Sequence, residues 1–336
     1  MFRTVLSLTL AAALAPAQAL AWGASGHRMI GEVAIRGLPQ DLPAFLRTPR
    51  AVLEVGELSR EPDRSKGSGR VHDTNRDPGH YINLSEDGTV LGGVKISALP
   101  PTRGAYETAL RIVETDSWKH GYLPYSIEDQ AQQLTKDFAM WRVAAFEETH
   151  EKTKARRTWY RADRERREAL IFTTLGQLSH FVGDAAQPLH VSIHYNGWGP
   201  YPNPNGYTSS HIHGPFEGDF VAANIKAADV LAILPAPAPC GCAPEDRAAG
   251  YIALTLAQVE PLYQLEKDGG FKGADPRGVA FASARLATGA GELRDIIVDA
   301  WAASIGAKAN VGYPQVKVSE VLAGAADPYE SLYGKD

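Results

Sequence analysis

Histidines and carboxylates stand at helical spacing in one short stretch of this chain. His180 and Asp184 are four residues apart, so on a helix they share one face, and Pro188 then ends that helix. The turn that Pro188 forces can bring His190 back toward the same cleft. Three such residues around the end of one helix are typical of a metal site rather than of a core histidine.

Two further groups of ligand-type residues lie on either side of this stretch. His213 and Glu217 repeat the four-residue spacing, and His80 follows a region that is rich in carboxylates. Nitrogen and oxygen ligands without thiolates suit zinc at open, catalytic sites. Manganese or iron could take the same ligands, but the number of imidazoles favours zinc.

The chain opens with the features of an exported protein. A positive residue, an apolar stretch and the small-x-small pattern Ala19-Leu20-Ala21 predict a signal peptide over residues 1–21. The mature protein is therefore expected in the periplasm or secreted to the medium, with Trp22 as its first residue. A free amine and the carbonyl oxygen of Trp22 could chelate one metal ion, and His27 could complete that site.

The composition is that of an ordinary globular protein. The 336 residues are 44% hydrophobic and carry a formal net charge of -5, which excludes a basic polyanion-binding protein and a disordered acidic chain. Beyond the signal peptide, no apolar run reaches the ~18 residues that suggest a membrane span. Cys240 and Cys242 could form a tight disulfide or stay reduced. Residues 22–336 are expected to form a single domain.

The hydrophobic pattern is mostly helical, which predicts an all-α fold: a multi-helix bundle with long loops. Helices are expected near residues 29–35, 104–115, 126–146, 166–186, 217–234, 245–266 and 276–305. Only residues 81–84 and 89–91 have a strand-like pattern, and both stretches are short.

Three polar stretches need a separate interpretation. Residues 56–80 and 191–216 are rich in Gly, Pro, Asn, Asp and His, and they are predicted to be long functional loops. The basic run over residues 152–167 is interpreted as a solvated helix face. A weak contact with a polyanion, aided by Trp159 and Tyr160, is the alternative.

Taken in order, these motifs resemble the S-one/P-one (type I) zinc nuclease family of fungi, plants and bacteria. The bacterial zinc-dependent phospholipase C family is a distant relative of those nucleases on the same helical fold. The resemblance spans residues 22 to about 220, and the ordered set is specific although each piece alone is weak. Its motifs are Trp22-Gly-x-x-Gly-His27, His80-Tyr81, His180-x3-Asp184-x5-His190 with Gln187-Pro188-Leu189 inside it, and His213-x3-Glu217.

The resemblance implies three zinc ions held by nine residues. Their groups would be Asp63, His80, His180 and Asp184; the amino nitrogen and carbonyl oxygen of Trp22 with His27 and a bridging Asp184; and His190, His213 and Glu217. The family carries a loop carboxylate somewhat closer to the first loop histidine than Asp63 is to His80, so Asp73 and Asp77 remain alternatives. Tyr81 stands where the nucleases pack an aromatic residue against a nucleobase, or it simply covers the cluster.

By the same resemblance, the chain is expected to hydrolyse single-stranded RNA or DNA to 5'-phosphorylated products. A metal-activated hydroxide would attack the phosphodiester, with Asp184 setting the metal spacing and Asp63 orienting the nucleophile. The alternative is a zinc-dependent phospholipase C that acts on phospholipid head groups. A non-catalytic zinc-binding protein is the second alternative.

Two departures and three spacings bear on that choice. Glu217 is typical of the phospholipases, since the nucleases usually have Asp there, and the sequence that follows His190 lacks the Asn-rich text of the nucleases. The 5-residue step from Trp22 to His27 and the 23-residue step from His190 to His213 match the nucleases. The 100 residues from His80 to His180 exceed the spacing in both families and suggest an inserted helical hairpin near residues 104–150.

Overall fold

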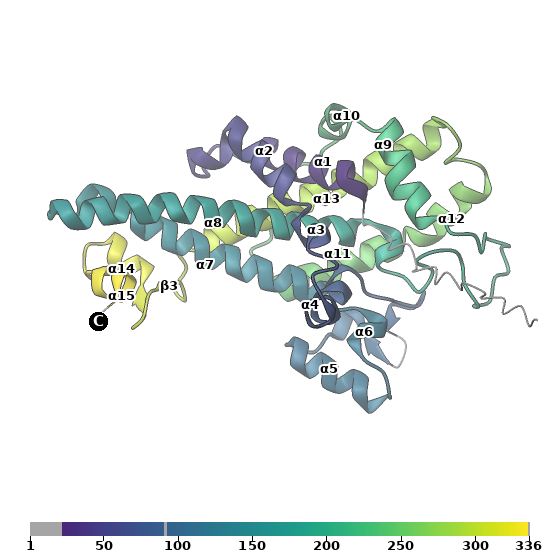
Figure 1. Ribbon diagram of the computed structural model, residues 1–336, viewed down its shortest axis with the longest axis horizontal. Coiled ribbons are helices and arrows are strands. Elements are labelled where there is room, and N and C mark those ends of the chain that lie inside the picture. Colours follow the sequence, from purple (N-terminus) through teal and green to yellow (C-terminus); the bar gives the residue numbers. More distant parts are fainter. Residues whose placement is uncertain (1–21, 91–92, 335–336) are drawn as a thin grey trace, which may run out of the picture.

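The computed structural model describes residues 22–90 and 93–334, and it is mostly helical, which confirms the predicted all-α class (Figure 1). The predicted signal peptide lies outside the described residues. None of the helices in the described ranges combines the length and apolarity that a bilayer span requires.

Fifteen α-helices are present in the described part of the chain, together with four strands of two residues each. The helices are α1 (Gly23–Arg36), α2 (Pro49–Leu58), α3 (Glu61–Arg64), α4 (Arg70–Arg76), α5 (Arg103–Ile112), α6 (Ser117–His120), α7 (Leu123–His150), α8 (Lys154–Ala186), α9 (Val221–Asn224), α10 (Ala227–Ala232), α11 (Pro244–Leu256), α12 (Val259–Lys267), α13 (Pro276–Ala303), α14 (Val318–Leu322) and α15 (Tyr329–Tyr333). The strands form two antiparallel pairs, β1 (Thr89–Val90) with β2 (Val94–Lys95) and β3 (Asn310–Val311) with β4 (Val316–Lys317).

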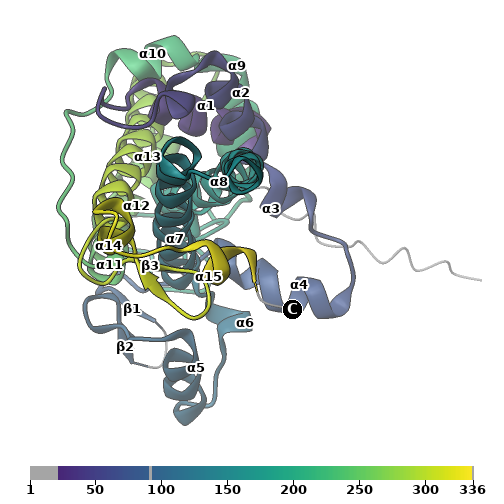
Figure 2. The ribbon, with the colours of Figure 1, turned by 90° about the vertical axis from the view of Figure 1, so that its left-hand side faces the viewer.

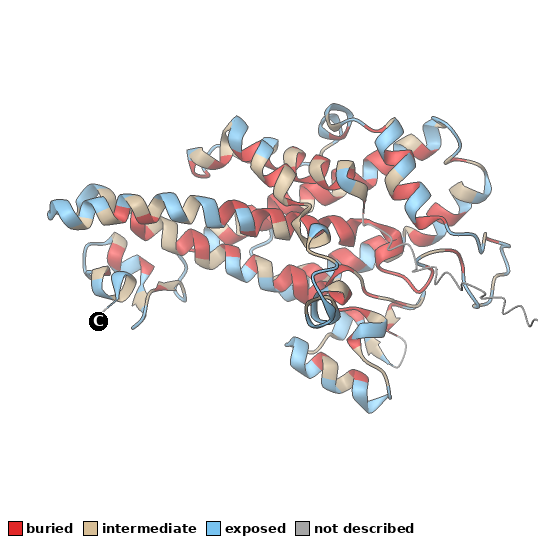
Figure 3. Cartoon of the chain, in the orientation of Figure 1, coloured by how far each residue is buried: buried red, intermediate tan, exposed pale blue. Residues whose placement is uncertain are grey.

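The long helix α8 organises the core. Its apolar stripe of Ile171, Leu175, Leu178 and Val182 is fully buried, because α1, α2, α7, α11 and α13 pack around it. Figure 3 shows that buried residues concentrate where α8 passes α1 and α13, while the far tip of the α7–α8 hairpin is exposed. The C-terminal half of α8 is thus held rigidly inside the protein, and this is the half that carries His180 and Asp184.

The basic run forms the first turns of α8, which supports its interpretation as a helix face. Most of its arginines bind carboxylates: Arg161 and Arg164 contact Glu148 at 2.8 and 2.6 Å, and Arg167 contacts Asp163 at 3.3 Å. Near the tip of the α7–α8 hairpin, a small separate core forms against α7 from β3, β4, α14 and α15 (Figures 1 and 2).

Several predicted elements differ from the structure. Residues 56–80 are not a loop but the end of α2, then α3, α4 and the 3-10 turn η2 (Asp77–His80), each too short to leave a hydrophobic period in the sequence. The predicted helix over residues 217–234 is broken, since the π-helical turn η5 (Pro215–Phe220) and α9 end at an extended Ile225 before α10 begins. The predicted helix over residues 245–266 is likewise interrupted between α11 and α12.

The structure also contradicts an inserted hairpin over residues 104–150. The second half of that segment is α7, which packs along α8, α11 and α13 as a core helix. The first half contains most of α5 and all of α6. Together with the preceding strands β1 and β2, it forms a lobe at the lower edge of Figure 1. The predicted loop over residues 191–216 is irregular up to residue 212, and its last residues lead into η5.

The Pro-rich segment 235–242 runs along α13 and is held there by side chains of that helix. Arg294 donates to the carbonyl oxygens of Pro235 and Ala236 at 2.6 and 3.1 Å. Asp299 accepts from the backbone N–H groups of Cys240 and Gly241 at 3.1 and 2.9 Å. Cys240 and Cys242 form a disulfide, which decides between the two states that the sequence left open.

Candidate metal centre

Three groups of ligand-type side chains meet where α8 ends. Within each group, the nitrogen and oxygen atoms that could bind a metal lie within 4.8 Å of one another. The groups are His27, His180 and Asp184; Asp63, His80 and His180; and His190, His213 and Glu217. The structure thus brings together eight of the predicted ligands, from segments that are up to 190 residues apart in the sequence.

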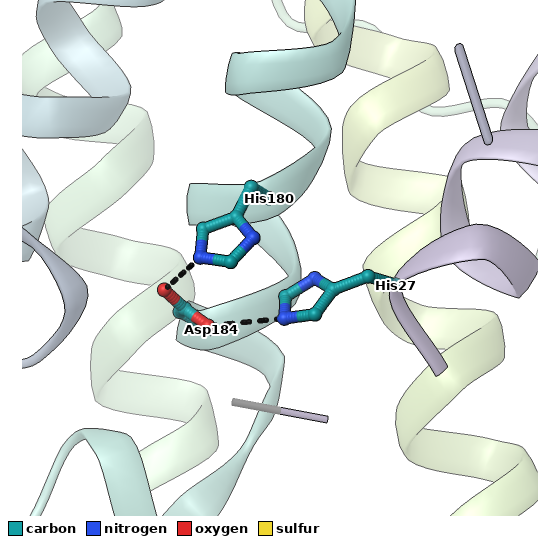
Figure 4. Close-up of side chains that lie close together, drawn as sticks. All are labelled: His27, His180 and Asp184. Carbon is teal, nitrogen blue, oxygen red and sulfur yellow. Dashed lines mark ion pairs between the residues drawn. The ribbon is translucent and has the colours of Figure 1, made fainter. Parts of the chain in front are cut away.

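Asp184 lies at the middle of the centre and presents its two oxygens to different histidines (Figure 4). Its Oδ1 is 3.5 Å from His27 Nε2, and its Oδ2 is 3.3 Å from His180 Nε2. The rings of His27 and His180 stack with their centroids 4.0 Å apart. The carboxylate is fully buried, so a charge at this position requires cationic partners.

Asp63 and His80 complete the second group. His80 Nδ1 lies 3.8 Å from Asp63 Oδ1 and 3.1 Å from Asp184 Oδ2. Of the three carboxylates that the sequence left open, Asp63 is the one in this group, whereas Asp73 pairs with His72 at 3.0 Å. The short helix α3 was not foreseen, and it is the element that carries Asp63 to the centre.

The third group stands beside the other two. Glu217 Oε2 lies 2.8 Å from His213 Nε2 and 3.6 Å from His190 Nε2. Pro188 begins the 3-10 turn η4 (Pro188–His190), which returns His190 to the centre as the sequence predicts. His190 Nδ1 is also 3.9 Å from Asp184 Oδ1, so the third group adjoins the first.

Backbone carbonyls fix the tautomers of two histidines. His180 Nδ1–H donates to the carbonyl oxygen of Ser59 at 2.8 Å, and His190 Nδ1–H donates to that of His80 at 2.7 Å. A carbonyl oxygen can only accept, so in the neutral form of each ring Nε2 is the nitrogen that carries a lone pair toward the centre. This is the usual way in which a protein orients a histidine toward a metal.

Many of the ligand atoms are buried without a hydrogen-bond partner within the described residues. They are both ring nitrogens of His27 and of His213, Asp63 Oδ1, Asp184 Oδ1, His190 Nε2 and Glu217 Oε1. Leaving one buried polar atom unpaired costs roughly 1–3 kcal/mol, so such a concentration is unusual in a native protein. Divalent cations would supply the missing partners, and the residues therefore fit the zinc ions that the resemblance implies.

The protonation states also suit ligands. Burial lowers the pKa of His27 to about 3 and that of His80 to about 4, so both rings stay neutral at pH 7. Burial would lower the pKa of His190 as well, but the carboxylates of Asp184 and Glu217 outweigh it and raise that pKa to about 9. A metal ion competes with this proton, so binding there would release it.

Trp22 reaches the centre by a different contact from the predicted one. Its indole is fully buried and donates to the carbonyl oxygen of Gly183 at 2.7 Å. Gly183 precedes Asp184 on α8, so the indole is held beside the centre. The backbone nitrogen of Trp22 donates to Glu217 Oε2 at 3.2 Å, which places this nitrogen at the third group. The chelate of Trp22 with His27 and Asp184 therefore stays a prediction.

Tyr81 lines the open side of the centre. A cavity of about 590 Å³ is lined by the largely buried His80, His190 and His213, and Tyr81 and Trp118 form part of its wall. The Tyr81 hydroxyl donates to the carbonyl oxygen of Trp118 at 2.7 Å, which fixes the ring at the rim. This position is compatible with both interpretations of Tyr81, a base-stacking platform and a cover over the cluster.

Two residues of the centre were not singled out from the sequence. Gln187 donates to Glu217 Oε2 at 3.1 Å and accepts from the backbone of Leu189 at 3.0 Å. Lys66 contacts Asp63 at 2.6 Å. The three-residue step from Asp63 to Lys66 could have indicated this ion pair, but only if the short helix α3 and the turn that follows it had been recognised.

Neither a scan against protein-family models nor a search of curated proteins finds a match for this chain. The assignment of a function therefore depends on the residues of the centre and on their geometry.

Proposed function

We propose that this chain is an exported, zinc-dependent phosphodiesterase that hydrolyses single-stranded nucleic acid. One observation carries the proposal: the two oxygens of Asp184 face different histidines inside a centre of buried, unpartnered ligand atoms that opens into a cavity. A bridging carboxylate of this kind would fix the distance between two metal ions. Many enzymes that hydrolyse phosphodiesters use two metal ions that are held close together.

Zinc, when bound here, would supply a nucleophile at neutral pH by lowering the pKa of a water molecule to about 7, and would offset charge on the phosphate. The residues of the chain do the rest. Asp63 belongs to the second group, where Lys66 contacts its Oδ1 at 2.6 Å, so this carboxylate can accept a hydrogen bond from the attacking water and orient it. Lys66, which lines the cavity beside it, provides a fixed positive charge for the phosphate.

The walls of this cavity favour a nucleic acid over a phospholipid. Lys66 and Lys119 contribute cations, and Trp118 and Tyr195 are 51% and 53% exposed on the same cavity. Exposed aromatic rings beside cations are the usual platform for unpaired bases and their phosphates. A diacyl lipid would need a continuous apolar surface instead, whereas this lining alternates aromatic, charged and amide side chains.

The test uses the mature protein, starting at Trp22, with metal analysis and four substrates. We expect close to three zinc ions per chain and chelator-sensitive hydrolysis of single-stranded DNA, single-stranded RNA and bis(p-nitrophenyl) phosphate, but not of phosphatidylcholine vesicles. Turnover of phosphatidylcholine alone would favour the phospholipase alternative. Bound zinc without turnover of any diester would favour the non-catalytic alternative.

A further inference from the structure

A second cavity lies on the other side of His80. Its volume is about 710 Å³, and it opens between α3, α4, the first turns of α7, and α8. His80 lines both this cavity and the cavity of about 590 Å³ that His190 and His213 also line. The turn η2, which ends at His80, therefore separates the two cavities. Ligand sites commonly have volumes of ~300–1,000 Å³, so this cavity has room for a nucleotide-sized group.

Two arginines without a carboxylate partner stand at this cavity. Arg76 at the end of α4 and Arg103 at the start of α5 are exposed, and neither forms an ion pair within the described residues. The carboxylate of Glu61 on the same wall is already bound by Arg64 at 2.8 Å. Asp129 is the other acidic residue of the lining. Two guanidinium groups without an ion-pair partner among the described residues thus line a cavity in which one of the two carboxylates is already paired.

Aromatic and amide groups complete the lining and are firmly held. The Arg103 guanidinium carbon lies 3.5 Å from the centre of the Tyr122 ring, whose hydroxyl donates to the carbonyl oxygen of Asn75. The Tyr125 hydroxyl donates to the carbonyl oxygen of Pro100 at 2.8 Å. These bonds join α7 to α4 and to the segment before α5. The wall is therefore formed in advance of any ligand, which limits the entropy lost on binding.

We propose that this cavity is a second subsite for the same nucleic-acid strand, which binds the phosphates that flank the scissile phosphate beyond His80. The inference rests on the proposed function. Guanidinium groups suit phosphate because their planar donors match its oxygens, while the buried rings of Tyr122 and Tyr125 support the wall behind them. The binding energy of such a subsite would favour oligomers over short diesters.

Much of the lining comes from the long interval between His80 and His180. It includes Arg103, Tyr122, Tyr125, Asp129 and Gln130. This interval therefore builds one wall of the second subsite.

The experiment compares the double variant Arg76→Gln/Arg103→Gln with the matched control Arg70→Gln/Arg111→Gln. The control removes the same charge from the same two helices, at exposed positions that do not line the cavity. Each protein is titrated with a fluorescein-labelled ten-nucleotide thymidine oligomer under chelator, and fluorescence anisotropy gives Kd at several salt concentrations. Turnover of the oligomer and of bis(p-nitrophenyl) phosphate is measured on the zinc-loaded proteins.

We expect the double variant to weaken oligomer binding about tenfold and to reduce the slope of log Kd against log salt by about 1.4, since each lost single-strand phosphate contact removes about 0.7. The ratio of kcat/KM for the oligomer to that for bis(p-nitrophenyl) phosphate should fall to a similar degree. The control should keep both values, and Arg103→Lys should restore most of the salt slope because it restores the charge.

The outcomes separate this inference from the proposed function. Equal salt slopes and equal kcat/KM ratios in the double variant and the control would overturn the subsite, while turnover by the wild type would still support the phosphodiesterase. Absence of chelator-sensitive turnover in the wild type would overturn the phosphodiesterase, and the anisotropy titration would then still decide whether the cavity binds a strand. Loss of binding to phosphatidylcholine vesicles, with oligomer binding unchanged, would overturn the subsite in favour of a lipid surface.

Discussion

The side-chain amide of Gln187, the C-cap residue of α8, donates to Glu217 Oε2 at 3.1 Å. This hydrogen bond joins the end of α8 to the third ligand group. Both side chains are fully buried. The same Glu217 oxygen lies 2.8 Å from His213 Nε2. Gln187 is therefore assigned as a positioning residue, which would act on a bound metal ion through the carboxylate that it holds.

Replacement of Gln187 by Leu should weaken zinc binding at the third group alone. Loss of such a hydrogen-bonded partner typically costs ~10–100-fold in metal affinity. Competitive titration with a chromogenic chelator should show one of three ions bound more weakly. Gln132→Leu, an exposed position on α7, is the control. Equal weakening of all three ions would show a general structural defect instead.

Asp184→Asn should have the most severe effect on the centre. The amide keeps the shape but removes the charge and one coordinating oxygen, so two groups should weaken together. We expect the phosphodiesterase rate to fall at least ~10³-fold, in line with several kcal/mol of lost charge stabilisation. Glu217→Asp retains a carboxylate and should lower the rate less than about tenfold. Steady-state kinetics with bis(p-nitrophenyl) phosphate measures both, and wild-type turnover by the Asn variant would rule out the bridging role.

A residue left ahead of Trp22 should abolish activity while the helical bundle stays folded. The backbone nitrogen of Trp22 already lies at the ligand groups, 3.2 Å from Glu217 Oε2. A free amine at that place can bind a metal, whereas an amide nitrogen is a far poorer ligand. Mass spectrometry should identify the first residue of each preparation, and circular dichroism should show unchanged helix content. Full turnover by the extended chain would refute a ligand role for the terminus.

Glu128→Gln should stabilise the protein at neutral pH and have little effect in mild acid. Burial, with the charge of Glu245, raises the pKa of Glu128 from 4.5 to about 7, and Glu128 Oε1 is buried without a hydrogen-bond partner among the described residues. The folded state therefore holds this proton more tightly than the unfolded state, so stability is lost as the pH rises through about 7. The free-energy advantage of the variant should grow by about 2 kcal/mol between about pH 5 and pH 8.

Urea denaturation at these two pH values measures that advantage. Asp246→Asn, which removes an exposed carboxylate on α11, is the control and should follow the wild type at both pH values. An advantage of Glu128→Gln that does not change with pH would mean that the carboxyl is not protonated in the folded protein.

The sequence predicted the centre better than it predicted the elements around it. His180 and Asp184 follow from a four-residue step on a strongly periodic helix, and both side chains are fully buried at one place. Asp63 was harder to place, because its helix α3 has only four residues and leaves no periodic pattern. Its approach to His80 depends on how α2 and α3 pack against α8, which is a tertiary effect.

The broken helix after Glu217 has a similar explanation. Its apolar residues continue at helical spacing, but Ile225 is extended with ψ 140, and the chain changes direction there. The buried side chains of Phe216, Phe220 and Val221 pack into the main core, and this packing outweighs the local preference for one continuous helix. Gln187 stands within one of the sequence motifs, but its partner Glu217 is 30 residues away, so the spacing of residues alone could not predict its role.

The segment 235–242 has the Pro-rich composition of a hinge between domains, yet its backbone is bonded to three residues of one helix face, Arg294, Asp295 and Asp299. Cleavage by a protease requires a stretch of backbone to detach and enter the enzyme, and here that means breaking several charge-assisted hydrogen bonds to α13. The part of the chain that carries the candidate metal ligands and the part that supplies α11 to α13 should therefore resist separation by limited proteolysis at this segment, where its Pro-rich composition alone would suggest a cut.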